Sequence, residues 1–241
     1  MRFARRADEL DAVLRLRYRV FNLELGEGLA ASAATGRDED AFDAACHHLL
    51  VEDAAAGAVI GTYRMQTAAM AAAGRGFYSA GEFDLSGLPA EVLERAIELG
   101  RACIAREHRN RQVLFLLWKG LARYLVATGA RYLFGCCSLT GQDPAEGLRA
   151  MAHLTARGRL HPRIAVAPLP GLECAGDPTA AAAVAADPAA VELPSLFRTY
   201  LRYGGLVCGP PAIDAEFKTI DFLVLLDSAG LDPRSRALFI D

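Results

Sequence analysis

The sequence IELGRACIAREHRNRQ, residues 97–112, decides the fold. Its first half is an apolar, strand-like run that Glu98 and Arg101 interrupt. Its second half is a charged loop without glycine, and a long apolar helix follows at once. Cationic side chains just ahead of a helix N-terminus predict an anion site, because the helix dipole and the first N–H groups are positive there. The cations of this loop are Arg106, Arg109 and Arg111. The usual phosphate-binding loop is rich in glycine, so this loop is expected to hold its anion differently.

Length and composition indicate a globular protein with a sizeable core. The chain has 241 residues, of which 53% are hydrophobic, enough for one large domain or two small ones. The net charge is −3, from 26 basic and 29 acidic residues. General nucleic-acid binding requires a clear basic excess, so this class of function is disfavoured.

The six cysteines have irregular spacing and include no CxxC pair, which is typical of reduced thiols rather than a disulfide framework. The run Cys46-His47-His48 is too small a cluster to indicate a metal centre, and we expect no metal site. The N-terminal sequence MRFARRADEL lacks the apolar segment of a signal peptide. The longest apolar runs, 113–118 and 222–226, are too short to cross a bilayer. We therefore expect a cytoplasmic protein that meets the inner membrane only peripherally.

Hydrophobic periodicity predicts an α/β (α+β) fold, with one curved mixed sheet flanked by helices. The predicted helices are 7–25, 91–96, 112–127, 144–157 and 195–203. The predicted strands are 47–53, 58–66, 97–104, 131–139, 204–208 and 221–227.

Three segments lack a clear period. Residues 30–40 predict a mobile loop, and residues 68–76 predict a connector rich in alanine and glycine. The segment 169–193 is low in complexity and predicts a loop or a flexible insertion, although a short surface helix around 180–186 explains it equally well. We expect a single domain over 1–241 with a flexible Ala/Pro-rich insertion at 170–194.

Glu98 and Arg101 are the first candidates for chemistry. Residues three apart in a regular strand point to opposite faces, but a bulge, which Gly100 permits, would bring both side chains to one side. Glu98 could then take a proton from an amine while Arg101 holds an anion. A structural ion pair explains the same spacing.

Two further features are charged. Asp38, Glu39, Asp40 and Asp43 form an acidic patch that suits a cationic substrate, although a solvated loop explains it too. Arg64 is a charge within an otherwise apolar strand, and it either reaches solvent or meets an anion.

Beyond these patterns, the chain resembles a known family, the GNAT-like ornithine N-acyltransferases, often labelled hemolysin-like. This family is related to the acyl-homoserine-lactone synthases and the N-acyl amino acid synthases. The similarity spans nearly the whole chain, apart from 30–37 and 172–194. It is carried by LRYRVFNLELG at 16–26, LVEDAAAGAVIGTYRMQ at 50–66, FYSAGEFDLSGL at 77–88, ELGRACIAREHRNRQVLFLLWKGLARYL at 98–125 and LRYGGLVCGPPAIDAEFKTIDFLVLL at 201–226.

The resemblance implies an acyl carrier protein as the acyl donor and no bound cofactor. GNAT enzymes that use acetyl-CoA carry an RxxGxG/A turn, and here Gln112 and Leu114 replace both glycines. A carrier protein presents a single phosphate on its phosphopantetheine arm together with an acidic surface, so Arg106, Arg109 and Arg111 suit that thioester donor.

The resemblance also implies roles for individual residues. Arg17 and Phe21 match positions that line the active-site cleft, Asp40 and Asp43 match its paired acids, and Arg64 matches its strand arginine. Glu98 and Arg101 match the Glu and Arg of the central strand. The chain departs from the lactone synthases where they place a Trp, because Glu27 and its neighbours stand there.

The implied reaction is transfer of a long-chain, 3-hydroxy fatty acyl group from the carrier protein to the α-amine of ornithine, which gives lyso-ornithine lipid. Glu98 is the expected base, and Arg17, Phe21, Asp40, Asp43 and Arg64 are expected to bind the substrate. Two alternatives remain open. The enzyme could acylate another amino acid or, like the lactone synthases, S-adenosylmethionine, or the chain could be a degenerate module that binds a carrier protein or a membrane surface.

Overall fold

The chain folds into two units that are each discontinuous in sequence. The computed structural model describes residues 1–176 and 191–239. The first unit comprises 1–76, 97–130 and the segment that begins at 232, and the second comprises 77–96 and 131–231. Within the described residues, no helix is long and apolar enough to span a membrane.

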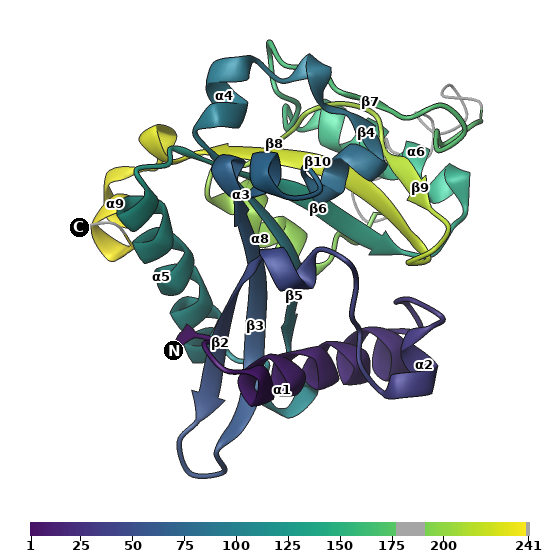
Figure 1. Ribbon diagram of the computed structural model, residues 1–241. Helices are drawn as coiled ribbons and strands as arrows, with labels where there is room; N and C mark the ends of the chain where they lie inside the picture. Colours follow the sequence, from purple (N-terminus) through teal and green to yellow (C-terminus); the bar gives the residue numbers. More distant parts are fainter. Residues whose placement is uncertain (177–190, 240–241) are drawn as a thin grey trace. The chain divides into compact units, whose positions relative to one another are not determined.

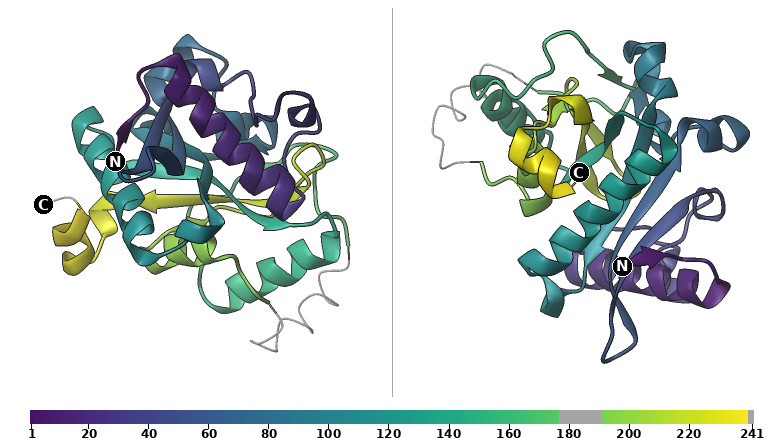
Figure 2. Two further views of the ribbon diagram at one scale, coloured as in Figure 1. Left: turned by 90° about the horizontal axis from the view of Figure 1, so that it is seen from below. Right: turned by 90° about the vertical axis from the view of Figure 1, so that its left-hand side faces the viewer.

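The first unit is built on an antiparallel sheet of order β1–β2–β3–β5. These strands are β1 (Arg2–Phe3), β2 (His47–Asp53), β3 (Ala58–Thr67) and β5 (Ala96–Ile104). Helices α1 (Ala7–Tyr18) and α5 (Arg111–Thr128) cover opposite faces of this sheet (Figures 1 and 2). Smaller elements are α2 (Ser32–Thr35), α3 (Ala68–Ala73), α9 (Pro233–Phe239) and 3₁₀ turns at Asp43–Ala45 and Arg106–His108.

The alternation of strand residues separates the two faces. A Cβ atom on Gly61 of β3 would lie 3.2 Å from Val113 of α5, so this residue faces α5. Gly120 of α5 lies against Leu49 of β2, where a Cβ atom would come within 2.5 Å of that side chain. The other face of β3, which carries Arg64 and Gln66, therefore looks toward α1.

The second unit has an antiparallel sheet of order β6–β10–β8, and β9 also pairs with β10. Its strands are β6 (Tyr132–Thr140), β8 (Leu206–Val207), β9 (Ala212–Asp214) and β10 (Thr219–Asp227), with a separate pair β4 (Phe83–Asp84) and β7 (Ala167–Pro168). Its helices are α4 (Ala90–Glu94), α6 (Pro144–Ala156) and α8 (Ser195–Arg202), with 3₁₀ turns at Tyr78–Gly81, Leu85–Gly87 and Ser228–Gly230.

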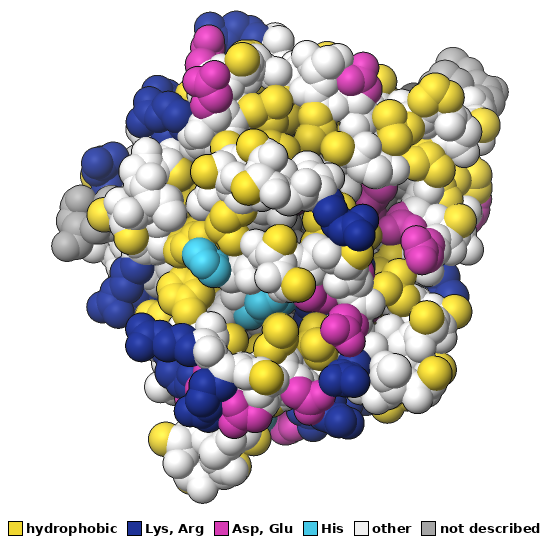
Figure 3. Space-filling model, viewed as in Figure 1, with side chains coloured by type: hydrophobic (Ala, Val, Ile, Leu, Met, Phe, Trp, Pro, Cys, Tyr) yellow, Lys and Arg dark blue, Asp and Glu magenta, His cyan; other side chains and the backbone are white. Residues whose placement is uncertain are grey.

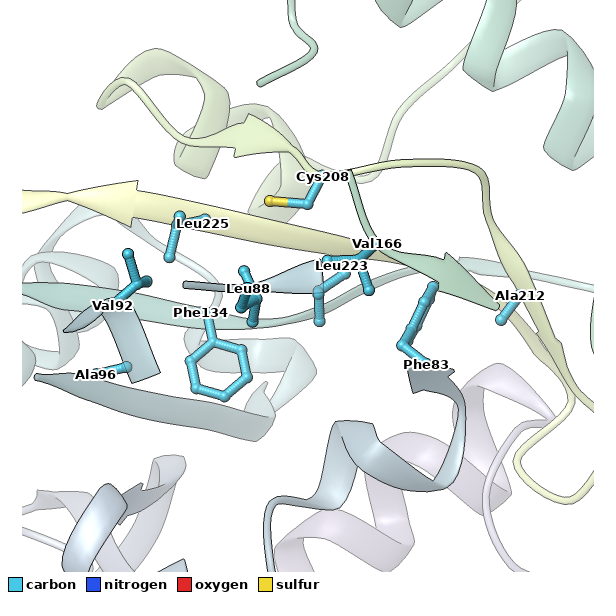
Figure 4. Close-up of a cluster of buried hydrophobic side chains, with 10 residues drawn as sticks. All are labelled: Phe83, Leu88, Val92, Ala96, Phe134, Val166, Cys208, Ala212, Leu223 and Leu225. Carbon is cyan, nitrogen blue, oxygen red and sulfur yellow. The ribbon is translucent and has the colours of Figure 1, made fainter. Parts of the chain in front are cut away.

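A hydrophobic cluster covers one face of β6 and β10 (Figure 4). Phe134 of β6 and Leu223 and Leu225 of β10 are its strand members. Phe83 and Val92 pack on them from the segment that precedes β5. The opposite face of β10 meets α8, where the rings of Phe197 and Phe222 lie 5.5 Å apart.

Most predicted elements are present within a few residues of their expected ends, but three predictions were wrong in detail. The predicted helix over 7–25 changes at Arg19 into a π-helix, Arg19–Leu25, that ends at Gly26. The alanine-rich connector begins with helix α3, which Thr67 caps by accepting a hydrogen bond from the backbone N–H of Met70. The loop over 30–40 contains helix α2 and the fully buried Asp38. Of the predicted insertion at 170–194, residues 177–190 lie outside the described residues.

Candidate active site

The acidic segment that precedes β2 is bound to an arginine of helix α1. Arg17 is fully buried, and its Nε donates to Asp38 Oδ1 at 2.7 Å. Its Nη1 and Nη2 donate to the two carboxylate oxygens of Asp43 at 2.7 and 3.2 Å. A planar guanidinium with this set of donors fixes both acids at once, because its N–H directions are rigid.

Two strand arginines complete this cluster from the sheet. Arg64 of β3 donates through Nη1 to both oxygens of Asp40, at 2.6 and 2.7 Å, and to Asp43 at 3.1 Å. Arg101 of β5 donates to Asp40 at 3.1 Å, and its Nε lies 3.3 Å from Asp38. The structure therefore joins three aspartates to three arginines, so the formal charges of the cluster cancel. We call this set the Arg–Asp cluster.

The arginines determine the protonation of the cluster. Burial by itself would raise the pKa of Asp43, but Arg17 and Arg64 outweigh it and hold that pKa far below its usual range. The pKa of Asp40 is also lowered, because Arg64 and Arg101 outweigh its burial. Both acids are thus ionised at neutral pH, and their oxygens accept from arginines. We expect them to shape the site rather than to bind a substrate ammonium directly.

A β-bulge brings Glu98 and Arg101 to the same side of the sheet. In the pairing of β3 with β5, Gln66 faces Glu98 and Arg64 faces Gly100, whereas Thr62 faces Cys103, so β5 has one extra residue there. Arg101 has a φ of 48°, in the left-handed region that residues with side chains rarely adopt. The bulge that Gly100 permits is therefore present, and the left-handed conformation falls on Arg101 itself.

Glu98 lies on the face of the sheet that carries the Arg–Asp cluster. Its directly opposite partner Gln66 and its neighbour Arg64 are two residues apart on β3, and opposite residues share a face. Glu98 is only 6% exposed. The structure thus brings together a buried carboxylate and the arginines of β3 and β5.

Neutral polar groups support this face. The Nε2 atom of His48 lies 3.0 Å from the carbonyl oxygen of Asp43, and burial lowers the pKa of this imidazole. Gln66 donates to the carbonyl of Gly76 at 2.7 Å and accepts from the thiol of Cys46 at 3.4 Å. These contacts fix the orientation of side chains next to the cluster.

Phe21 belongs to the π-helix and is buried. Its carbonyl accepts hydrogen bonds from the backbone N–H groups of Gly26 and Glu27. These bonds reach further along the chain than the bonds of an α-helix, so the last turn of the helix is wider. Glu27 is also buried.

The basic loop between β5 and α5 is exposed. Arg106 and Arg111 lie at the surface. Arg109 forms a bidentate ion pair with Glu24, in which Nη1 donates to Oε1 at 2.5 Å and Nη2 donates to Oε2 at 2.9 Å. Asn110 caps α5, because its Oδ1 accepts from the N–H groups of Gln112 and Val113, both at 3.0 Å. Two of the N–H groups that a pyrophosphate would use, those of Gln112 and Val113, therefore already donate hydrogen bonds to Asn110. On the face drawn in Figure 3, basic and acidic side chains are interspersed with hydrophobic ones.

The thiols of Cys46 and Cys103 are poor nucleophiles. Burial raises the pKa of Cys103 to about 12 and that of Cys46 to about 11. These two thiols stay protonated at neutral pH, so a covalent acyl-cysteine step at either residue is disfavoured.

Sequence reasoning missed three residues of this site. Asp38 was seen only as a member of the acidic patch, and it is a fully buried partner of two arginines. His48 and Gln66 received no role. The alternation of β2 and β3 carried the signal for both, because a polar residue at an inward position of a strand needs a buried partner.

Comparisons with known proteins identify the family of this chain. Residues 16–119 match the family described as the acetyltransferase (GNAT) domain. The chain is 36% identical over 240 residues to the L-ornithine N(alpha)-acyltransferase of Rhizobium meliloti (strain 1021), which covers 97% of this chain and 81% of that protein. It is 33% identical over 250 residues to the protein of the same name from Rhodobacter capsulatus, covering 99% of this chain and 93% of that protein.

Solved structures show the same fold at low sequence identity. An N-acyl amino acid synthase from uncultured soil microbes superposes with a TM-score of 0.54 at 11% identity, covering 95% of this chain and 97% of that chain. A CoA-dependent acyl-homoserine lactone synthase gives a TM-score of 0.51 at 14% identity, covering 97% and 84%. The expected GNAT-like α/β fold, a mixed sheet flanked by helices, is thus confirmed. The chain belongs to the L-ornithine N(alpha)-acyltransferase family and is an acyltransferase.

Proposed function

We propose that this protein transfers a long-chain 3-hydroxy fatty acyl group from an acyl carrier protein to the α-amine of ornithine, which gives lyso-ornithine lipid. The observation that carries this proposal is the placement of Glu98, a buried carboxylate on a bulged strand, on the face that holds the Arg–Asp cluster. The names of the relatives support ornithine as the acceptor.

In the proposed reaction, Glu98 removes a proton from the α-ammonium of the acceptor. The free amine attacks the thioester carbonyl, the C–N bond forms, and the C–S bond then breaks. The phosphopantetheine thiolate leaves and takes the second proton of the attacking nitrogen, and Glu98 returns the first proton to solvent, so the products are an amide and a free thiol. A backbone N–H of the bulge at 100–102 would polarise the carbonyl as charge develops on its oxygen. Arg64 or Arg101 would hold the carboxylate of the acceptor, and Arg17 and Phe21 would shape the site.

The carrier protein is favoured as the donor by the loop before α5. The positions of the two usual glycines hold Gln112 and Leu114, and Asn110 occupies two of the N–H groups at the helix start. These features suit a donor with one phosphate and an acidic surface better than one with a pyrophosphate. Arg106 and Arg111 are exposed and would meet that surface, while Arg109 is held by Glu24. No cofactor is required by this reaction.

Thiol release from a 3-hydroxyacyl carrier protein tests the reaction directly. Ornithine, lysine, glutamine, glycine, tyrosine and S-adenosylmethionine serve as acceptors, acyl-CoA serves as the parallel donor, and mass spectrometry identifies the product. Glu98→Gln keeps the shape of the side chain and removes the base, so we expect kcat to fall by about 10²- to 10⁴-fold. Glu91→Gln, an exposed carboxylate on α4, is the matched control.

Each part of the proposal has its own contrary result. Full activity of Glu98→Gln would exclude Glu98 as the base. Equal kcat/KM with acyl-CoA would refute the donor argument, and faster turnover with another amine would replace ornithine. Binding of the carrier protein without turnover of any acceptor would indicate an interaction module.

A further inference from the structure

An ion pair connects the π-helix to the basic loop before α5. Both terminal nitrogens of Arg109 donate to the carboxylate of Glu24, Nη1 to Oε1 at 2.5 Å and Nη2 to Oε2 at 2.9 Å. The Nε atom of the same guanidinium donates to the backbone carbonyl of Ile104, the last residue of β5, at 3.1 Å. The chain itself therefore holds the guanidinium of Arg109 through a carboxylate and a carbonyl.

The contact with Glu24 uses the N–H groups that would bind a phosphate. Arginine binds a carboxylate and a phosphate through the same two parallel N–H donors, so one anion excludes the other from them. Glu24 occupies the place that a phosphate would take on Arg109. The side chains of Arg109 and Glu24 are 39% and 21% exposed, so a ligand from solution can reach the pair.

The start of α5 is occupied in a similar way. Oδ1 of Asn110 accepts from the backbone N–H groups of Gln112 and Val113, both at 3.0 Å. A helix N-terminus binds a phosphate through such N–H groups, and these two already have a partner within the chain. Glu24 and Asn110, which come from different segments, thus occupy donors that a diphosphate would use.

The surroundings of Glu24 suit a protein partner better than a nucleotide. Arg106 and Arg111 are exposed, and Leu23 and Leu25 on either side of Glu24 are 66% and 39% exposed. Exposed apolar side chains near cations can contact the apolar and acidic groups of a protein surface together. A nucleotide with several phosphates depends more on each cation, so it loses more when one guanidinium is already neutralised.

We propose that Glu24 is a donor-specificity residue that excludes acyl-CoA, because it holds Arg109 in an ion pair and so keeps it from the pyrophosphate of that donor. The inference rests on the function proposed above, in which a carrier protein supplies the acyl group. Glu24 has no part in the proton transfer or in the binding of the acceptor. Its replacement should therefore change which donor is used and leave the KM for ornithine as it is.

Donor selectivity tests the proposal. The value of kcat/KM is measured at saturating ornithine with a 3-hydroxyacyl carrier protein and with the matching 3-hydroxyacyl-CoA. Glu24→Gln should raise kcat/KM for the acyl-CoA about 10-fold, because the charged N–H donors of Arg109 become available to the pyrophosphate. The value for the carrier protein should stay within about threefold. Glu107→Gln is the matched control, since it makes the same charge change at an exposed position of the same loop, and its kcat/KM for the acyl-CoA should also stay within about threefold.

A double variant assigns the gain to Arg109. In Glu24→Gln/Arg109→Gln the gain with acyl-CoA should disappear, because the guanidinium that the first substitution releases is no longer present. Glu24→Gln should remain folded, since a partly exposed ion pair contributes little to stability. Circular dichroism checks the fold of each variant, and Glu24→Ala carries the test if Glu24→Gln is not folded.

Three results would overturn the proposal while the proposed function stands. These are no gain with acyl-CoA in Glu24→Gln, an equal gain with both donors, and a gain that the double variant keeps or that Glu107→Gln reproduces. Equal use of both donors by the unmodified protein would overturn the proposal together with the donor argument.

The proposed function can also fail separately. If the unmodified protein turns over neither donor, calorimetry with CoA decides the inference. Tighter binding of CoA to Glu24→Gln than to the unmodified protein, lost in the double variant, would support it. Equal binding to the unmodified protein and to Glu24→Gln would overturn it.

Discussion

Replacing Asp38 by asparagine should lower the free energy of unfolding, because it removes one charge from the buried Arg–Asp cluster. Asp38 is fully buried, and it accepts from Arg17 Nε at 2.7 Å and lies 3.3 Å from Arg101 Nε. The asparagine has the same shape but no charge. It leaves three guanidinium groups with two carboxylates in a place where water cannot compensate the excess charge.

The magnitude follows from the cost of an unpaired buried ion. Breaking a buried pair by removing one partner costs about 3–5 kcal/mol. The amide oxygen of asparagine can still accept one hydrogen bond, which is worth about 1 kcal/mol. We therefore expect the free energy of unfolding to fall by about 3 kcal/mol. With an m-value of about 3 kcal/mol/M, the midpoint of urea unfolding should drop by about 1 M. Activity should fall about 100-fold, because Arg101 would lose its ion pair with Asp38.

Asp11→Asn is the matched control. Asp11 has similar contacts, with Arg15 Nε at 2.7 Å and Arg37 Nη1 at 3.0 Å, but this group is 34% exposed. Exposed pairs contribute little, so we expect its urea midpoint to stay within experimental scatter. If Asp38→Asn lowered the midpoint no more than Asp11→Asn does, burial would not be the deciding variable and the reasoning would be wrong.

Three further predictions concern a double variant of the cluster, a close backbone contact and a titrating histidine. The double variant Asp38→Asn/Arg101→Gln restores the charge balance of the cluster. In urea unfolding it should therefore lose about 1–3 kcal/mol less free energy of unfolding than the two single variants lose together. Strictly additive losses would contradict this. Gly209→Ala should lower the free energy of unfolding by about 2–3 kcal/mol, since its Cβ atom would lie 2.0 Å from the carbonyl oxygen of Val166, and an unchanged melting temperature would refute that close approach. Burial lowers the pKa of His48, so on acidification the unfolded chain binds a proton at this imidazole before the folded chain does, and the free energy of unfolding falls as pH drops below about 6.5. His48→Gln should make the free energy of unfolding less dependent on pH in this range. An unchanged pH dependence in the variant would assign the effect to another group.

The sequence predicted regular elements well because their signals are local. The period of α5 and the apolar run of β5 are both set by neighbours in the chain, and both elements end within a residue or two of their expected limits. The π-helix over 19–25 was not predictable in this way, because a single widened turn hardly alters the hydrophobic period. The short helices α2 and α3 lie in alanine-rich stretches where no period exists.

The candidate site was predictable in its members but not in its connections. Arg17 and Arg64 were expected to line it, yet their partners lie 21 to 26 residues away along the chain, and Arg101 reaches Asp40 across 61 residues. Residue types indicate that such charges need partners, but only the packing of α1 on the sheet decides which acid each arginine meets. The same packing buries Asp38, which composition alone assigns to a solvated loop.

The arrangement of charges suggests why a buried ionic cluster is kept at all. Buried ion pairs contribute little net stability compared with well-packed apolar side chains. Their value here is geometric, because Arg17, Arg64 and Arg101 come from a helix and two different strands and all converge on the single segment 38–43. This convergence holds the bulge of β5 and the strand position of Glu98 in one arrangement. A cluster that is electrically complete in itself is well suited to positioning and poorly suited to binding a further cation.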